Sequence, residues 1–160
     1  MVTITVNGVR HEIQAKDDTP LLYVLRNDLQ LSSVLIDGKE VRSCVTPIST
    51  LTAKQEITTL EGLPARWAKL KGLSREQAKD ILHPVQQAWI EEQTPLCGFC
   101  QSGMMMVATE LLEKNSNPTD AQIKAAFTTE GPSPHLCRCG SYVAIMDAVK
   151  HAASLMGKGK

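Results

Sequence analysis

The sequence lacks the features that mark several common protein classes. Its 160 residues carry 17 Lys and Arg against 17 Asp and Glu, so the net charge is zero and no basic stripe indicates nucleic acid as a partner. No run of about eighteen apolar residues predicts a membrane-spanning helix. The first residues show no charged segment or apolar stretch of an export signal. We expect a cytoplasmic chain that neither binds nucleic acid nor spans a membrane.

A disulfide framework is also disfavoured, because the chain has five cysteines. An odd count would leave one thiol over in a chain without a secretory signal. Four of the five form two close pairs, in Cys97-Gly98-Phe99-Cys100 and in Cys137-Arg138-Cys139. The two pairs could close around one metal centre.

The first sixty or so residues predict a small mixed sheet packed on one helix. Asn7-Gly8 and Asp37-Gly38 are each flanked by β-branched or apolar runs, which is typical of a two-residue hairpin turn. Pro20 precedes leucines and valines at helical spacing, and Pro is well suited to a first helical turn. The run 57–60 could add one more strand.

From Glu61 the pattern becomes helical, after the turn-rich segment 61–64. About four helices are expected: one begins at Pro84, one follows Ser102, one follows the capping box of Thr119 with Gln122, and one begins near Ser141. The fold class is therefore α+β, with an N-terminal mixed domain at 1–62 and a helical domain at 63–160.

Each cysteine pair lies immediately before a predicted helix. Two helix N-termini would direct unpaired backbone N–H groups and positive dipole ends at the thiolate sulfurs. Gly98 and Gly140 allow a close backbone approach and turn conformations that other residues disfavour. This arrangement favours an anionic sulfur cluster, whose reduction potential would be tuned by hydrogen bonds to sulfur.

The alternative is a structural zinc site with four cysteine ligands, in a zinc-stabilised module that binds a partner protein. Zinc pairs are commonly both Cys-x-x-Cys, with a shorter gap than the 36 residues between Cys100 and Cys137. Spacing alone favours iron-sulfur but leaves zinc open. A free-standing ferredoxin is a third possibility, and it is weaker because a lone carrier does not need the helical domain.

Motifs spread over most of the chain resemble the small iron-sulfur subunit of the molybdenum hydroxylases, the xanthine dehydrogenase and aldehyde oxidase family. The strongest lie at 97–104 and 136–142, and others at 83–88, 20–26, 37–39 and 43–44. The resemblance implies a ferredoxin-like β-grasp domain followed by a four-helix domain, each normally holding one [2Fe-2S] cluster. It also implies a non-catalytic chain that carries electrons.

In that family a separate large subunit with a molybdenum-pterin cofactor oxidises an aldehyde or N-heterocycle with water-derived oxygen. The electrons pass through the small subunit towards a flavin, cytochrome or other acceptor. By motif match, Cys97, Cys100, Cys137 and Cys139 would hold the cluster nearest the molybdenum. Cys139 would also lie close to the pterin. Relatives often carry glutamine where this chain has Leu96, so Gln101 becomes a candidate for a pterin contact.

The chain departs from the family in one place. Relatives have a glycine-rich loop with three cysteines after the first helix, whereas here Leu31 continues through Ser32-Ser33 into Val34. Cys44 matches the fourth ligand, and one thiol cannot hold a cluster that needs four. Either the protein lacks the loop, with Cys44 a small buried residue, or residues of the molecule are missing from this sequence and Cys44 ligates a second cluster. The coincidence with the ligand loop favours the latter.

Overall fold

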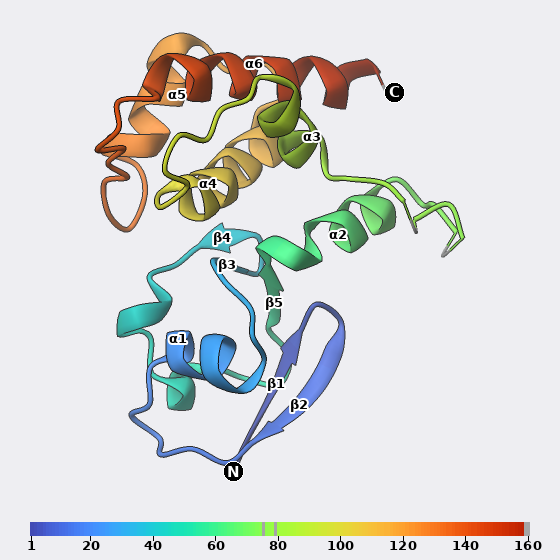
Figure 1. Cartoon of the computed structure of the whole chain (residues 1–160). Helices are drawn as coiled ribbons and strands as arrows, with labels where there is room; N and C mark the ends of the chain where they lie inside the picture. Colours follow the sequence, from blue (N-terminus) through green and yellow to red (C-terminus); the bar gives the residue numbers. More distant parts are fainter. Residues whose placement is uncertain (75, 79, 159–160) are drawn as a thin grey trace. The chain divides into compact units, whose positions relative to one another are not determined.

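The computed structural model describes residues 1–74, 76–78 and 80–158. The chain divides into two compact units, Met1–Ala78 and Lys79–Lys160. In Figure 1 the first unit runs from blue to green and the second from green to red. Strands occur in the first unit, while helices dominate the described part of the second, in agreement with the predicted α+β class.

The first unit is built on a five-stranded sheet with the order β2-β1-β5-β3-β4. β1 pairs in parallel with β5, and the other neighbours are antiparallel. Both predicted hairpin turns are confirmed, because Asn7, Gly8, Asp37 and Gly38 all have positive φ, as two-residue turns with this twist require. The strands are β1 Val2–Val6, β2 Val9–Ile13, β3 Val34–Ile36, β4 Lys39–Glu40 and β5 Glu56–Thr59.

A short helical segment packs against this sheet, as predicted from the Pro20 region. It consists of α1, Leu21–Tyr23, and a π-helical turn, Val24–Asp28. Leu21 and Leu25 are fully buried and join Ile4, Ile48 and Ile57 in the core of the unit. Short 3-10 turns at Ser43–Val45, Ile48–Thr50 and Leu60–Gly62 complete the connections.

The sheet is complete across the point where the chain departs from the resembled family. The Leu31 N–H donates to the Leu25 carbonyl at 2.7 Å, and Gln30 between the helical turn and β3 has a φ of 57°. At the start of β3, the Leu60 N–H donates to the Ser33 carbonyl at 3.0 Å. A short connection therefore suffices to bring β3 into its place beside β5.

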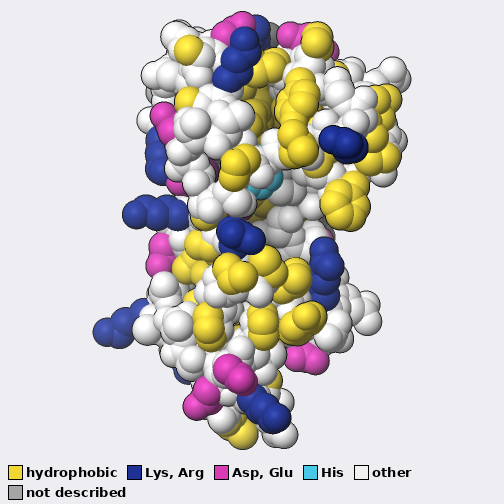
Figure 2. Space-filling model, turned by 90° about the vertical axis from the view of Figure 1, so that its left-hand side faces the viewer, with side chains coloured by type: hydrophobic (Ala, Val, Ile, Leu, Met, Phe, Trp, Pro, Cys, Tyr) yellow, Lys and Arg dark blue, Asp and Glu magenta, His cyan; other side chains and the backbone are white. Residues whose placement is uncertain are grey.

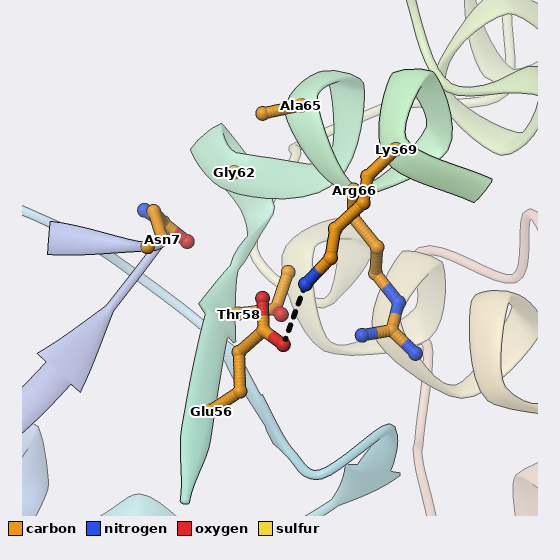
Figure 3. Close-up of a pocket in the computed structure, with 8 residues that line it drawn as sticks. Asn7, Glu56, Thr58, Gly62, Ala65, Arg66 and Lys69 are labelled. Atoms are coloured by element: carbon orange, nitrogen blue, oxygen red, sulfur yellow. Dashed lines mark hydrogen bonds and ion pairs between the residues drawn. The ribbon is translucent and has the colours of Figure 1, made fainter. Parts of the chain in front are cut away.

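Helix α2, Leu63–Leu70, belongs to the first unit, so the compact units divide later than the predicted boundary at residue 62. Leu63 at its start is fully buried. Lys69 forms an ion pair with Glu56 of β5 at 3.4 Å, across a hollow drawn in Figure 3. The helical pattern after residue 62 was predicted correctly, but its first helix packs on the sheet.

The second unit has four helices within the described residues, as predicted: α3 Pro84–Glu91, α4 Gln101–Lys114, α5 Asp120–Thr128 and α6 Tyr142–Lys158. His83 caps α3 by accepting the Val85 N–H at Nδ1, 3.1 Å away, and Thr119 forms the predicted capping box with Gln122. α3 packs against α4 and α6. Among the described residues, no helix is long and apolar enough to cross a membrane.

Gly62 lies against the side chain of Asn7, and a Cβ at position 62 would overlap the Asn7 amide (Figure 3). Asn7 is held there by two 2.9 Å hydrogen bonds, from the Thr59 N–H to Asn7 Oδ1 and from Asn7 Nδ2 to Thr59 Oγ1. Gly62→Ala should therefore lower the free energy of unfolding by about 1–3 kcal/mol, measured by urea denaturation.

The matched control is Gly157→Ala, because Gly157 is also helical but an added Cβ there meets no atom within 4 Å. Its effect should lie between zero and a gain of about 1 kcal/mol, from the higher helix propensity of alanine. Equal unfolding free energies for Gly62→Ala and the wild type would contradict the proposed steric contact.

Candidate metal centre

Two tight turns, each at the start of a helix, carry the four paired cysteines. Cys100 is the N-cap residue of α4, and Cys137 precedes α6 by five positions. Gly98 and Gly140 have φ values of 81° and 79°, which confirms that the turns need glycine-like backbone conformations. The Gln101 N–H points to the Gly98 carbonyl, and the Gly140 N–H to the Cys137 carbonyl, both at 3.3 Å.

The four thiols are brought together: Cys97 hydrogen-bonds with Cys139 and Cys100 with Cys137, and charge interactions also connect the two pairs. Cys97 and Cys139 are exposed, Cys100 is half-buried and Cys137 is buried. Among the described residues, no three His, Cys, Asp or Glu side chains are arranged as ligands of a single metal ion. We call Cys97 and Cys139 the outer pair, because both are exposed, and Cys100 and Cys137 the inner pair, because both are at least half-buried.

The inner thiols have opposite pKa shifts. Burial, followed by the interaction with Cys137, raises the pKa of Cys100 to about 11. Hydrogen bonds from the Ser141 hydroxyl and the Ser141 N–H lower the pKa of Cys137 to about 7. In the outer pair, the hydrogen bond between the thiols lowers the pKa of Cys97 and raises that of Cys139. Each pair thus favours one thiolate, and the Cys137 sulfur is the better solvated by hydrogen bonds.

A buried hydrogen-bond network surrounds the inner pair. Gln101 Oε1 accepts from Trp89 Nε1 at 2.7 Å, and Gln101 Nε2 lies 3.4 Å from both Cys100 Sγ and Ser141 Oγ. Ser141 Oγ and N lie 3.2 and 3.4 Å from Cys137 Sγ. Sequence reasoning assigned no role here to Trp89 or Ser141. The only signal in the sequence was the position of Ser141 in Cys139-Gly140-Ser141.

The placement of Gln101 bears on its expected pterin contact. The side chain is 4% exposed, and both ends of its amide already have partners within the unit. A pterin contact through this amide would require breaking the bonds to Trp89 or Cys100. Cys139, by contrast, is exposed and accessible to a partner.

Large apolar side chains are exposed around the cysteine turns. Phe99 is 93% exposed, and Leu96, Leu136 and Val143 are each more than two-thirds exposed. They are direct or near neighbours of the cysteines in sequence. Figure 2 shows one face of the molecule on which hydrophobic side chains reach the surface. Large apolar side chains exposed beside a site are a feature of protein-binding surfaces.

Cys44 was expected to be buried if no second cluster exists, and this expectation is wrong. It is exposed on the 3-10 turn Ser43–Val45, and its neighbour Val45 is 62% exposed. The turn lies on the surface of the first unit, which contains no other cysteine. The first unit therefore holds a single thiol and no group of four.

The donor set of the second unit fits an iron-sulfur cluster. A [2Fe-2S] cluster takes four cysteine thiolates, and its stability and potential depend on hydrogen bonds to sulfur. The structure provides two thiol pairs together with N–H and O–H donors directed at the Cys100 and Cys137 sulfurs. Four cysteine thiols with hydrogen-bond donors directed at two of their sulfurs are the chemistry of a cysteine-ligated metal centre.

Comparison with known proteins supports this assignment. The family model described as a [2Fe-2S] binding domain matches residues 69–150. The chain is 40% identical to the nicotinate dehydrogenase "A" chain of Pseudomonas putida, covering 98% of this chain and 97% of that protein. It is 39% identical to the alpha chain of isoquinoline 1-oxidoreductase of Brevundimonas diminuta, covering 96% and 97%.

A crystal structure of the aldehyde oxidoreductase from Desulfovibrio desulfuricans matches with a TM-score of 0.81 and 31% identity. The match covers 99% of this chain but only 17% of that much longer chain. The present chain belongs to the family of small iron-sulfur subunits of the molybdenum hydroxylases. Within that family it is an electron-transfer subunit of an oxidoreductase.

The alignments also measure how this chain departs from its relatives. The alignment with the Pseudomonas protein has 171 positions. The aligned 98% of this chain's 160 residues fills about 157 of them, so about fourteen positions of that alignment have no residue of this chain. The Brevundimonas alignment, with 168 positions and 96% of the chain, gives the same difference of about fourteen. A difference of this size is large enough to include the three-cysteine loop that the family resemblance leads us to expect.

Proposed function

We propose that Cys97, Cys100, Cys137 and Cys139 would together hold one [2Fe-2S] cluster. The observation that carries this proposal is that two turns, one before α4 and one before α6, bring the four thiols together. The Gln101 amide and the Ser141 N–H and hydroxyl are available as donors to the inner sulfurs. When bound, such a cluster supplies one-electron transfer.

The proposed partner is a large subunit with a molybdenum-pterin cofactor, which oxidises an aldehyde or an N-heterocycle. The names of the two similar proteins refer to nicotinate and isoquinoline, which are N-heterocycles. Cys139 would face the pterin, since its side chain is exposed and Leu96 and Phe99 offer an apolar contact beside the same pair. Electrons would leave towards a flavin, a cytochrome or another carrier on a further subunit.

In finer detail, the first unit would be a ferredoxin-like β-grasp domain and the second a four-helix [2Fe-2S] domain. The mixed sheet with β1 and β5 parallel at its centre, covered by α1, supports the former. The four helices α3 to α6 with both cysteine turns support the latter. The cytoplasmic location expected from the sequence stays a prediction.

A zinc-stabilised interaction module is the second candidate, since four cysteines also bind structural zinc. A tetrahedral zinc site would use the same four sulfurs, whereas the family model that matches residues 69–150 is that of a [2Fe-2S] binding domain. The asymmetric burial of these pairs also suits a centre that exchanges electrons at its exposed end. Both features favour iron-sulfur.

Removing an inner ligand should eliminate the cluster. Cys100→Ser is expected to reduce bound iron and acid-labile sulfide to below about a tenth of the wild-type values and to remove the red-brown colour, because the centre needs four thiolates. Iron, sulfide and zinc are measured on the same purified sample. Cys44→Ser is the matched control, since this exposed thiol lies in the other unit.

Undiminished iron in Cys100→Ser would contradict the ligand assignment. Stoichiometric zinc without iron in the wild type would replace the electron-transfer proposal by the zinc module. Loss of iron in Cys44→Ser as well would show that Cys44 takes part in metal binding.

The number of clusters can be counted directly. With a single thiol in the first unit, a chain of this sequence should hold two irons and two sulfides, and the denatured polypeptide should have the 17.5 kDa mass of the sequence. Intact mass spectrometry and iron analysis of the same preparation test both values. Four irons together with a larger mass would show that the molecule contains the ligand loop and that Cys44 serves a second cluster.

A further inference from the structure

A single donor-only group fixes the orientation of the Gln101 amide in the network around the inner thiols. The indole Nε1 of Trp89 can only donate, so the atom of Gln101 that faces it at 2.7 Å must be the carbonyl oxygen. The amide nitrogen of Gln101 is then forced to face Cys100 Sγ and Ser141 Oγ, each at 3.4 Å. The orientation of this amide follows from the chemistry of its neighbour.

The hydrogen bonds to the second inner sulfur follow the same order from donor to acceptor. Because Ser141 Oγ accepts from Gln101, its hydroxyl hydrogen is available for Cys137 Sγ at 3.2 Å. The Ser141 N–H adds a further donor at 3.4 Å. A cysteine that ligates iron is a thiolate, which can only accept. Trp89, Gln101 and Ser141 therefore form a one-way donor chain that ends on the two inner sulfurs.

Reversal of the Gln101 amide would affect both sulfurs together. Its carbonyl oxygen would then face Cys100 Sγ, where two acceptors repel, and would also accept the Ser141 hydroxyl that now faces Cys137. The network is enclosed, with Trp89 2% and Ser141 8% exposed, so water cannot readily replace a lost donor. Trp89 lies with Val85 and Ala88 among the buried residues of α3, whose start is fixed by the His83 cap.

We propose that Trp89 is a positioning residue that sets the reduction potential of the centre by locking the Gln101 amide with its N–H groups towards the inner sulfurs. The proposal rests on the proposed function, since it requires the cluster to be held by these cysteines. A reduced centre carries one more negative charge, so donors to its sulfurs stabilise the reduced form more than the oxidised form. Loss of the lock should therefore lower the potential.

The test uses the full-length chain purified with its cluster, titrated with dithionite and followed by electron paramagnetic resonance. Trp89→Phe and Gln101→Met should each retain iron and sulfide but show a lower midpoint potential than the wild type. Ser141→Ala should lower it as well, through Cys137 alone. Trp67→Phe, at the chain's other tryptophan in the first unit, is the matched control and should leave the potential unchanged.

The double variant separates positioning from general packing. If Trp89 acts through the amide, adding Trp89→Phe to Gln101→Met should produce no further shift, whereas independent effects would add. Additive shifts, or an unchanged potential in Trp89→Phe with full iron content, would overturn the proposal. A wild type that binds no iron would overturn the proposed function instead.

Should Trp89→Phe lose its iron, the indole N–H can be removed without changing the ring size. Benzothienylalanine, which has sulfur in place of the N–H, is incorporated for tryptophan in a Trp67→Phe background, so that only position 89 changes. A lowered potential supports the locked amide. A potential equal to that of Trp67→Phe contradicts it.

Discussion

The second unit is organised around the fact that cysteine thiolates accept hydrogen bonds but cannot donate them. Four sulfurs that ligate a cluster would need positive dipole ends and donors on their buried sides. The turns before α4 and α6 provide the helix ends, and Ser141 and Gln101 provide donors to the inner pair. Helix α3 contributes to the same network, since its Trp89 donates to the Gln101 amide oxygen.

Because the two thiol pairs differ in burial, one end of the site is enclosed and the other end is accessible. The inner thiols are enclosed by a polar network whose members are nearly inaccessible, which restricts solvent reorganisation around that end. The outer thiols and the apolar side chains of Leu96 and Phe99 are exposed. Electron exchange with another protein requires an accessible end, and a stable potential requires a protected one. This unit provides both within two short turns.

Local signals predicted much of the fold and the grouping of the four paired cysteines. Asn7-Gly8 specifies its turn through backbone conformation, Pro84 and Thr119 begin helices through their own chemistry, and cysteine spacing needs no tertiary information. The role of Trp89 could not be predicted, because it depends on how α3 packs against α4. The domain boundary was placed too early for a similar reason, since an amphipathic α2 has the same pattern whichever core it covers.

The short connection before β3 separates what the fold needs from what a second cluster needs. The register of β3 with β5 and the bond from Leu60 to Ser33 form without additional residues, so a ligand loop at this point would contribute thiols and not sheet stability. The relatives carry about fourteen more aligned positions. The first unit of this chain is complete, and its single cysteine, Cys44, is exposed. If one cluster transfers all of the electrons, they must enter and leave through the second unit, and the first unit would serve as a folded scaffold.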